Sequence, residues 1–111
     1  MTYDSETRFL ETPIFTEAVE ELLDHDGYRA LQSSLILRPE AGAVIRQSGG
    51  LRKLRWALAG KGKRGGCRII YFWHEASETF FMLYAYRKSQ QEDLTSHQLR
   101  ILNRLVREEL G

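Results

Sequence analysis

Cysteine and long hydrophobic runs are scarce or missing in this chain. Cys67 is the only cysteine, which excludes an internal disulfide framework and suits a reducing compartment. Its apolar neighbours in the sequence indicate a small buried residue rather than a reactive thiol. No apolar run is long enough to cross a membrane, and the acidic N-terminal residues do not form a signal-peptide pattern. The sequence therefore predicts a soluble cytoplasmic protein without a membrane partner.

Motifs for metals, nucleotides and common catalytic machineries are also missing. The three histidines, His25, His74 and His97, are far apart and lack the spacing of metal ligands. The chain has no Walker A loop, no dinucleotide-binding glycine pattern, no nucleophile elbow and no paired-carboxylate motif. We therefore expect no metal and no small-molecule cofactor.

The composition that remains is typical of one folded domain. The chain has 111 residues, of which 42% are hydrophobic and 11% aromatic, and it contains no internal repeats or linkers. This length leaves no room for a second independent domain core. We expect a single domain covering residues 1–111.

Hydrophobic periodicity in the first part of the chain predicts a strand and two helices. A short strand is predicted over residues 7–12. Thr12 can cap a helix that begins at Pro13, and a second helix follows and ends before Pro39. The two helices are expected to form an αα-hairpin.

The second part of the chain predicts a sheet and a last helix. After Gly42 the period becomes extended, and three runs predict an antiparallel meander: residues 51–58, 67–74 and 79–86. Thr95 and Gln98 form a capping box that begins the C-terminal helix. The expected class is α+β, with an N-terminal helical hairpin packed on an antiparallel sheet and a C-terminal helix.

Charge is strongly segregated along the chain, although the net charge is only +1. Residues 1–45 contain nine acidic and three basic residues, whereas residues 46–88 contain ten basic and two acidic residues. Charges that serve solubility alone are usually mixed in sign. The basic segment therefore indicates a polyanionic partner.

A glycine-rich loop is predicted within the basic segment, over residues 59–66. It places Lys61, Lys63 and Arg64 among four glycines. Glycines let a backbone approach a phosphate closely, and the cations neutralise it. A flexible, solvated hairpin loop is the alternative.

The predicted strands carry further cations on defined faces. Lys53 and Arg55 project from one face of their strand because side chains alternate with a period of two. Arg68 begins the next strand, and one face of the third contributes Tyr84, Tyr86 and Lys88. Together they could form a concave basic patch on which phosphates bind and an unpaired base stacks. The alternative is a solvated sheet face whose arginines pair with the acidic helices.

Three strings in the chain resemble a known family. They are GGLRKLR at 49–55, GKGKRGGCRIIY at 60–71, and YRK at 86–88 ahead of Asp93-Leu94. They are similar to the RelE/HigB family, and more narrowly to the HigB-like branch of bacterial type II toxin–antitoxin toxins. The resemblance implies a small RelE-like (microbial-RNase-like) fold that cleaves messenger RNA in the ribosomal A site. It also implies a cognate helix-turn-helix (HigA-like) antitoxin.

The resemblance also implies roles for individual residues. Arg68 matches the arginine that contacts the scissile phosphate. The expected catalytic set is Lys53, Arg55, Arg68, Tyr86 and Lys88, and the expected phosphate-binding set is Arg52, Lys61, Lys63, Arg64 and Arg87. Leu94 stands where the family usually has a tyrosine, which leaves Tyr86 or a lysine as the general base.

Residue chemistry agrees with ribonuclease activity. RNA supplies its own nucleophile, the 2′-OH, so the protein needs a base, cations for the pentavalent phosphorane and an acid for the leaving 5′-oxygen. A lysine crowded by arginines is expected to have a lowered pKa and to transfer protons near neutrality. Two other functions stay open: a non-catalytic inhibitor of the gyrase-poisoning ParE type, and an RNA-binding module that does not cut.

Overall fold

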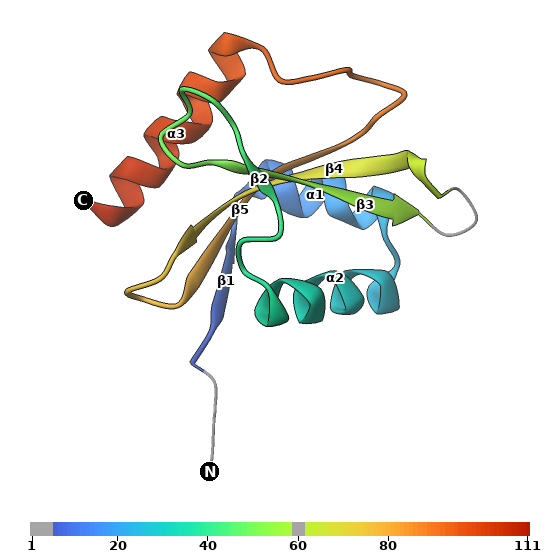
Figure 1. The fold of residues 1–111 in the computed structure, drawn as a ribbon, viewed down its shortest axis with the longest axis horizontal. Coiled ribbons are helices and arrows are strands. Elements are labelled where there is room, and N and C mark those ends of the chain that lie inside the picture. The colour runs from blue at the N-terminus through green and yellow to red at the C-terminus, as the bar shows by residue number, and fades with distance from the viewer. Residues whose placement is uncertain (1–5, 59–61) are drawn as a thin grey trace.

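The computed structural model describes residues 6–58 and 62–111, which form three helices and five strands (Figure 1). The α+β class expected from the sequence is confirmed. In chain order the elements are β1 (Arg8–Glu11), α1 (Pro13–Leu22), α2 (His25–Leu37), β2 (Ala43–Val44), β3 (Arg52–Leu58), β4 (Gly62–His74), β5 (Thr79–Arg87) and α3 (Ser96–Leu110).

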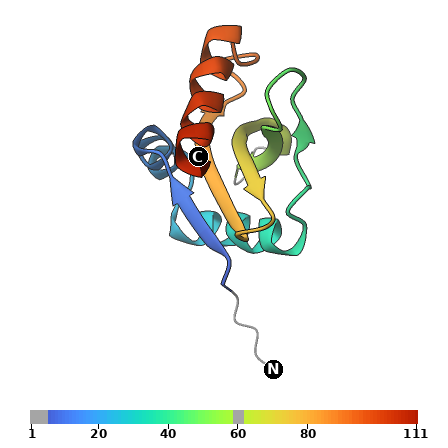
Figure 2. The same cartoon turned by 90° about the vertical axis from the view of Figure 1, so that its left-hand side faces the viewer.

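The sheet has the order β1-β5-β4-β3-β2 and is mixed. The antiparallel meander of β3, β4 and β5 is confirmed, and β2 adds an antiparallel edge strand that the sequence did not predict. The expectation of a purely antiparallel sheet was wrong, because β1 pairs parallel with β5 and Arg8 lies opposite Thr79. The two strands lie side by side in Figure 2. Hydrophobic periodicity is a local signal, so it cannot identify which distant strand pairs with β1.

Helices α1 and α2 cover one face of the sheet. Thr12 caps α1, since its Oγ1 accepts a hydrogen bond of 3.0 Å from the Phe15 amide. Apolar residues at helical spacing, including Phe15 on α1 and Leu31 on α2, are fully buried in one cluster with residues of β4 and β5. Cys67 belongs to this core, and burial raises the pKa of its thiol to about 11. The predicted buried position of the cysteine is therefore confirmed.

Helix α3 covers part of the opposite face. Its capping box is confirmed: Thr95 Oγ1 accepts from the Gln98 amide at 3.0 Å, and Gln98 Oε1 accepts from the Thr95 amide at 3.0 Å. Leu102 and Val106 then pack on Leu51 and other residues of this face. In the described part of the chain, no helix combines the length and apolarity needed to span a membrane.

The loop predicted over residues 59–66 is shorter in the structure, because β4 begins at Gly62. Leu58 pairs with Gly62, and the register shifts between Trp56 and Leu58. At Gly66 a Cβ atom would lie 2.2 Å from the carbonyl oxygen of Trp56. Gly66 therefore lets β3 and β4 approach each other at an irregular point in their pairing. This glycine, expected to let the backbone approach a phosphate, thus has a structural role.

Replacing Gly66 by alanine is expected to destabilise the protein. The new methyl group meets backbone atoms of β3 rather than a flexible side chain, so the strands must separate. We expect a loss of about 2–3 kcal/mol in the free energy of unfolding, measured by urea denaturation. A variant as stable as the wild type would contradict the proposed packing role.

The segment between α2 and β3 is fixed to the sheet and to α3. Tyr71 Oη donates to the Pro39 carbonyl at 2.7 Å and accepts from the Gly42 amide at 3.0 Å. The Ser48 carbonyl accepts a hydrogen bond of 2.6 Å from Asn103 Nδ2 of α3. Gly49 then adopts a φ of 76°, a conformation that glycine allows, and the chain turns into β3. This turn is thereby held against α3.

Candidate functional site

Three residues expected in the site form one row across the central strands. Arg55 on β3 lies opposite Arg68 on β4, and Arg68 lies opposite Tyr86 on β5. The next row carries Lys53 and Tyr84 at its two ends. Direct cross-strand neighbours on one face are about 5 Å apart at their Cβ atoms. We call the surface formed by these five residues the basic face; they are Lys53, Arg55, Arg68, Tyr84 and Tyr86.

The basic face shares its side of the sheet with α3 but lies beyond the part that the helix covers. Alternation along β3 puts Leu51, Lys53 and Arg55 on the α3 side and Leu54 and Trp56 on the other. In Figure 1, α3 lies away from the end of the sheet where β3 finishes and β4 starts. Strand periodicity therefore predicted correctly that Lys53 and Arg55 share one face of their strand, as Tyr84 and Tyr86 do on theirs.

Arg68 is the most unusual member of the basic face. Its side chain is only 6% exposed, and its Nη1 donates to the Cys67 carbonyl at 3.3 Å. Among the described residues it forms no ion pair with a carboxylate. A buried cation without a counter-ion costs stability, so an external anion is the partner that its position suits.

Tyr86 is also buried, with 4% of its surface exposed. Its hydroxyl has no hydrogen-bond partner among the described residues. Burial, and secondarily the nearby Asp93 carboxylate, raise the pKa of Tyr86 to about 12. The phenol is therefore protonated at neutral pH and can donate a proton, but it is not a ready base. Its ring offers little surface for a stacked base, whereas Tyr84 is only half-buried.

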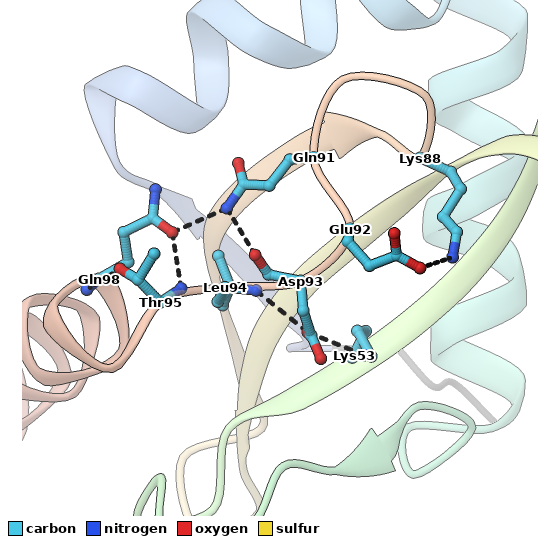
Figure 3. A network of polar contacts seen from close by, with 8 residues as sticks. All are labelled: Lys53, Lys88, Gln91, Glu92, Asp93, Leu94, Thr95 and Gln98. Atoms are coloured by element: carbon cyan, nitrogen blue, oxygen red, sulfur yellow. Dashed lines mark hydrogen bonds and ion pairs between the residues drawn. The ribbon is translucent and has the colours of Figure 1, made fainter.

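The segment between β5 and α3 brings acids to the expected lysines (Figure 3). Asp93 Oδ1 accepts from Lys53 Nζ at 3.1 Å, and Glu92 Oε2 lies 3.5 Å from Lys88 Nζ. The hydrogen bond from Lys53 lowers the pKa of Asp93 below its ordinary value. Sequence reasoning assigned no role to Asp93, because forty positions separate it from Lys53 and no spacing rule joins them.

The same segment is anchored to the start of α3. Gln91 Nε2 donates to the Asp93 carbonyl and to Gln98 Oε1, each at 2.8 Å (Figure 3). Leu94 packs with the α3-side core, so an apolar contact occupies the position where a tyrosine was expected. The capping box thus also fixes the segment that carries Asp93.

The remaining expected residues lie elsewhere. Arg52 is on the α1–α2 side of the sheet, where its Nη1 donates to the carbonyls of Gly42 at 2.7 Å and Glu40 at 3.2 Å. Arg87 shares that side and lines a surface depression with acidic residues of α1. Neither arginine joins the basic face. Lys61, and the side chains of Lys63 and Arg64, fall outside the described part of the structure.

The described residues contain no cluster of three or more histidine, cysteine, aspartate or glutamate side chains that could hold a metal ion. What the basic face provides is positive charge, a buried protonated phenol and a lysine–carboxylate pair, which suit an anionic ligand. A comparison with protein families agrees. Residues 31–110 match the family described as the RelE toxin of the RelE / RelB toxin–antitoxin system. The chain therefore belongs to the RelE toxin family and is a toxin whose partner is a cognate antitoxin.

Proposed function

We propose that this toxin is a ribosome-dependent endoribonuclease that cuts messenger RNA in the A site and thereby inhibits translation. Its antitoxin is proposed to be of the helix-turn-helix, HigA-like type, and the toxin to belong to the HigB-like branch. The observation that carries the proposal is the placement of Arg68, buried without an acidic partner in the described structure and in one row with Arg55 and Tyr86. A scissile phosphate would supply the missing counter-charge.

The proposed reaction is an attack of the 2′-OH on the adjacent phosphorus. The 2′-oxygen loses its proton and forms a bond to phosphorus, while the bond to the leaving 5′-oxygen breaks and that oxygen gains a proton. Arg68 would stabilise the charge on the pentavalent phosphorane, where a fixed donor has its largest effect. Arg55, which is exposed, would hold the phosphate backbone, together with Lys61, Lys63 and Arg64.

Proton transfer in this scheme falls to a lysine, which as a neutral amine would accept the 2′-OH proton, and to Tyr86, which would donate one. Lys53 is our preferred lysine because it lies in the row beside Arg68, whereas Lys88 lies just beyond the end of β5. Tyr86 would serve as a donor to the leaving oxygen or the phosphate, since its raised pKa of about 12 keeps the phenol protonated. Asp93 would act as a positioning residue that orients the Lys53 side chain.

The direct test is to induce the protein in a bacterial host and to map new mRNA 5′ ends against codon position. Breaks confined to translated frames, at a fixed position within the codon, are expected. Growth arrest without breaks would contradict the proposal and direct attention to gyrase, tested by plasmid supercoiling. RNA that stays bound and intact with translating ribosomes would instead indicate a binding module.

Tyr86→Phe separates the chemical role of Tyr86 from its structural role. The phenol hydroxyl is buried and has no partner in the described structure, so its removal should not lower stability. We expect an unchanged or slightly higher free energy of unfolding, with a cleavage rate at least tenfold lower. Because Tyr86 stays protonated up to a pH of about 12, its titration should not affect the wild-type rate between pH 6 and about 9.

Tyr84→Phe is the matched control for this change. Tyr84 lies on the same strand and face, with its ring centroid 5.7 Å from that of Tyr86, but it is more exposed. Its variant should keep both stability and cleavage rate. Full activity in Tyr86→Phe would remove Tyr86 from the proposed mechanism.

A further inference from the structure

A second concentration of positive charge lies away from the basic face, in a groove between α3 and the turn over residues 46–49. We call it the α3 groove; its volume is about 760 Å³. Figure 1 shows the turn (green) beside the helix. Among the described residues, its lining contains one acidic residue, Glu108, and four arginines: Arg46, Arg100, Arg104 and Arg107.

The arginines reach one side of α3 because of their spacing. Arg100, Arg104 and Arg107 follow each other at intervals of four and three residues, which places them on one face of a helix. All four groove arginines are exposed, and within the described structure none forms an ion pair. The net charge of the C-terminal segment did not reveal this cluster, because acidic residues at the end of α3 cancel the charge of its arginines.

Hydrogen bonds to α3 hold the groove in shape. Asn103 Nδ2 donates to the Ser48 carbonyl at 2.6 Å, which ties the turn to the helix. Asn103 Oδ1 accepts from Arg107 Nε at 2.9 Å and so orients that guanidinium. Gln47 adopts a φ of 56°, a left-handed conformation that is uncommon for residues other than glycine. One side chain of α3 therefore fixes both walls before any ligand binds.

The chemistry of the groove favours phosphate groups. Arginine presents a planar fork of donors that matches phosphate oxygens, and a row from Arg100 to Arg107 extends about 10 Å along the helix axis. Leu99 is the only large apolar side chain in the described lining, so the groove offers little to the apolar anchors of a folded or helical peptide. The length of the row suits more than one phosphate of a nucleic-acid strand.

We propose that the α3 groove is a second binding site for the phosphodiester backbone of RNA, separate from the basic face. The inference rests on the proposed function, because it takes RNA as the macromolecule that this toxin engages. The backbone could belong to the strand that is cut or to ribosomal RNA. The site would contribute affinity and orientation without touching the reacting atoms.

The test compares two double variants of the full chain. Arg100→Gln with Arg104→Gln removes two charges from the groove. Arg29→Gln with Arg38→Gln removes two exposed charges elsewhere, one on α2 and one at its C-cap. Glutamine keeps helix propensity close to that of arginine, so both should fold, which circular dichroism checks. The probes are a short single-stranded RNA, measured by fluorescence anisotropy, and ribosomes without mRNA, measured by co-sedimentation.

The affinity of the groove variant for at least one probe should fall about tenfold or more. The slope of log affinity against log salt concentration should become shallower by about one to two units. The control variant should match the wild type. A loss confined to ribosomes would identify ribosomal RNA as the source of the backbone, and a loss with the short RNA would identify the bound strand. Both results support the site.

Two results would overturn the proposal. In one, the wild type binds RNA, and the groove variant binds each probe as tightly as the wild type does. In the other, only binding to poly-L-glutamate weakens, which would make the groove a site for an acidic protein segment. A wild type that binds RNA without cleaving it would refute the proposed endoribonuclease activity and leave the groove intact, so the two failures are distinguishable.

Discussion

Replacing Arg68 by methionine is expected to lower the cleavage rate about a hundred- to a thousandfold while the protein stays as stable as the wild type or becomes more stable. The rate falls because the variant loses a fixed donor to the developing charge on the phosphorane. Stability does not fall because the wild-type guanidinium is buried, donates to the Cys67 carbonyl at 3.3 Å and has no acidic partner among the described residues. An unbranched apolar side chain can fill the same space without the cost of burying a charge.

Arg52→Met is the matched control, because it changes an arginine of the neighbouring strand on the opposite side of the sheet. Arg52 donates to two carbonyls and lies 3.9 Å from Glu40, so its loss should lower the free energy of unfolding by about 1–2 kcal/mol. Cleavage should persist. The measurements are urea denaturation and single-turnover cleavage on programmed ribosomes. An Arg68→Met variant with the wild-type rate would exclude Arg68 from the reaction.

The different positions of these two arginines show which parts of the site could be predicted. Side chains in a strand alternate, so Lys53 and Arg55 share one face, and the same rule puts Arg52 with Leu54 on the other. The signal that excludes Arg52 from the basic face was therefore present in the sequence, although the expected phosphate-binding set included Arg52. Thr12 and Thr95 were predicted as helix caps because a cap depends on residues only three positions away.

The features that could not be predicted depend on contacts between distant residues. Asp93 reaches Lys53 because Gln91 and Gln98 fix the path of the segment before α3. The parallel pairing of β1 with β5 joins residues about seventy positions apart, and no hairpin or turn signal marks it. The sequence around Gly66 is typical of a phosphate-binding loop, whereas in the structure Gly66 lies close to the backbone of Trp56. In each case the spatial path of the chain decides the role.

Lys53→Gln is expected to lower the cleavage rate about a hundred- to ten-thousandfold, and Lys88→Gln less than tenfold. Both lysines are half-buried and both pair with an acid of the same segment, so charge alone does not separate them. Their positions do: Lys53 stands in the row beside Arg68 and is held by Asp93 at 3.1 Å, whereas Lys88 follows β5 and contacts the exposed Glu92 at 3.5 Å. A fixed amino group close to the attacking 2′-OH accepts its proton more effectively than one at the margin.

Asp93→Asn then tests how Lys53 is positioned. Because Lys53 lowers the pKa of Asp93, the carboxylate stays ionised throughout the neutral range. The ion pair weakens only when the pH falls below the ordinary pKa of an aspartate side chain. The wild-type rate should therefore show no acid limb from Asp93 between pH 5 and about 8. Asparagine keeps an oxygen for the Lys53 hydrogen bond but lacks its charge, so the variant should lose rate mainly in kcat, by less than Lys53→Gln. If Lys88→Gln instead caused the larger loss, proton transfer would belong to Lys88, and the Lys53–Asp93 pair would serve only to hold the segment against the sheet.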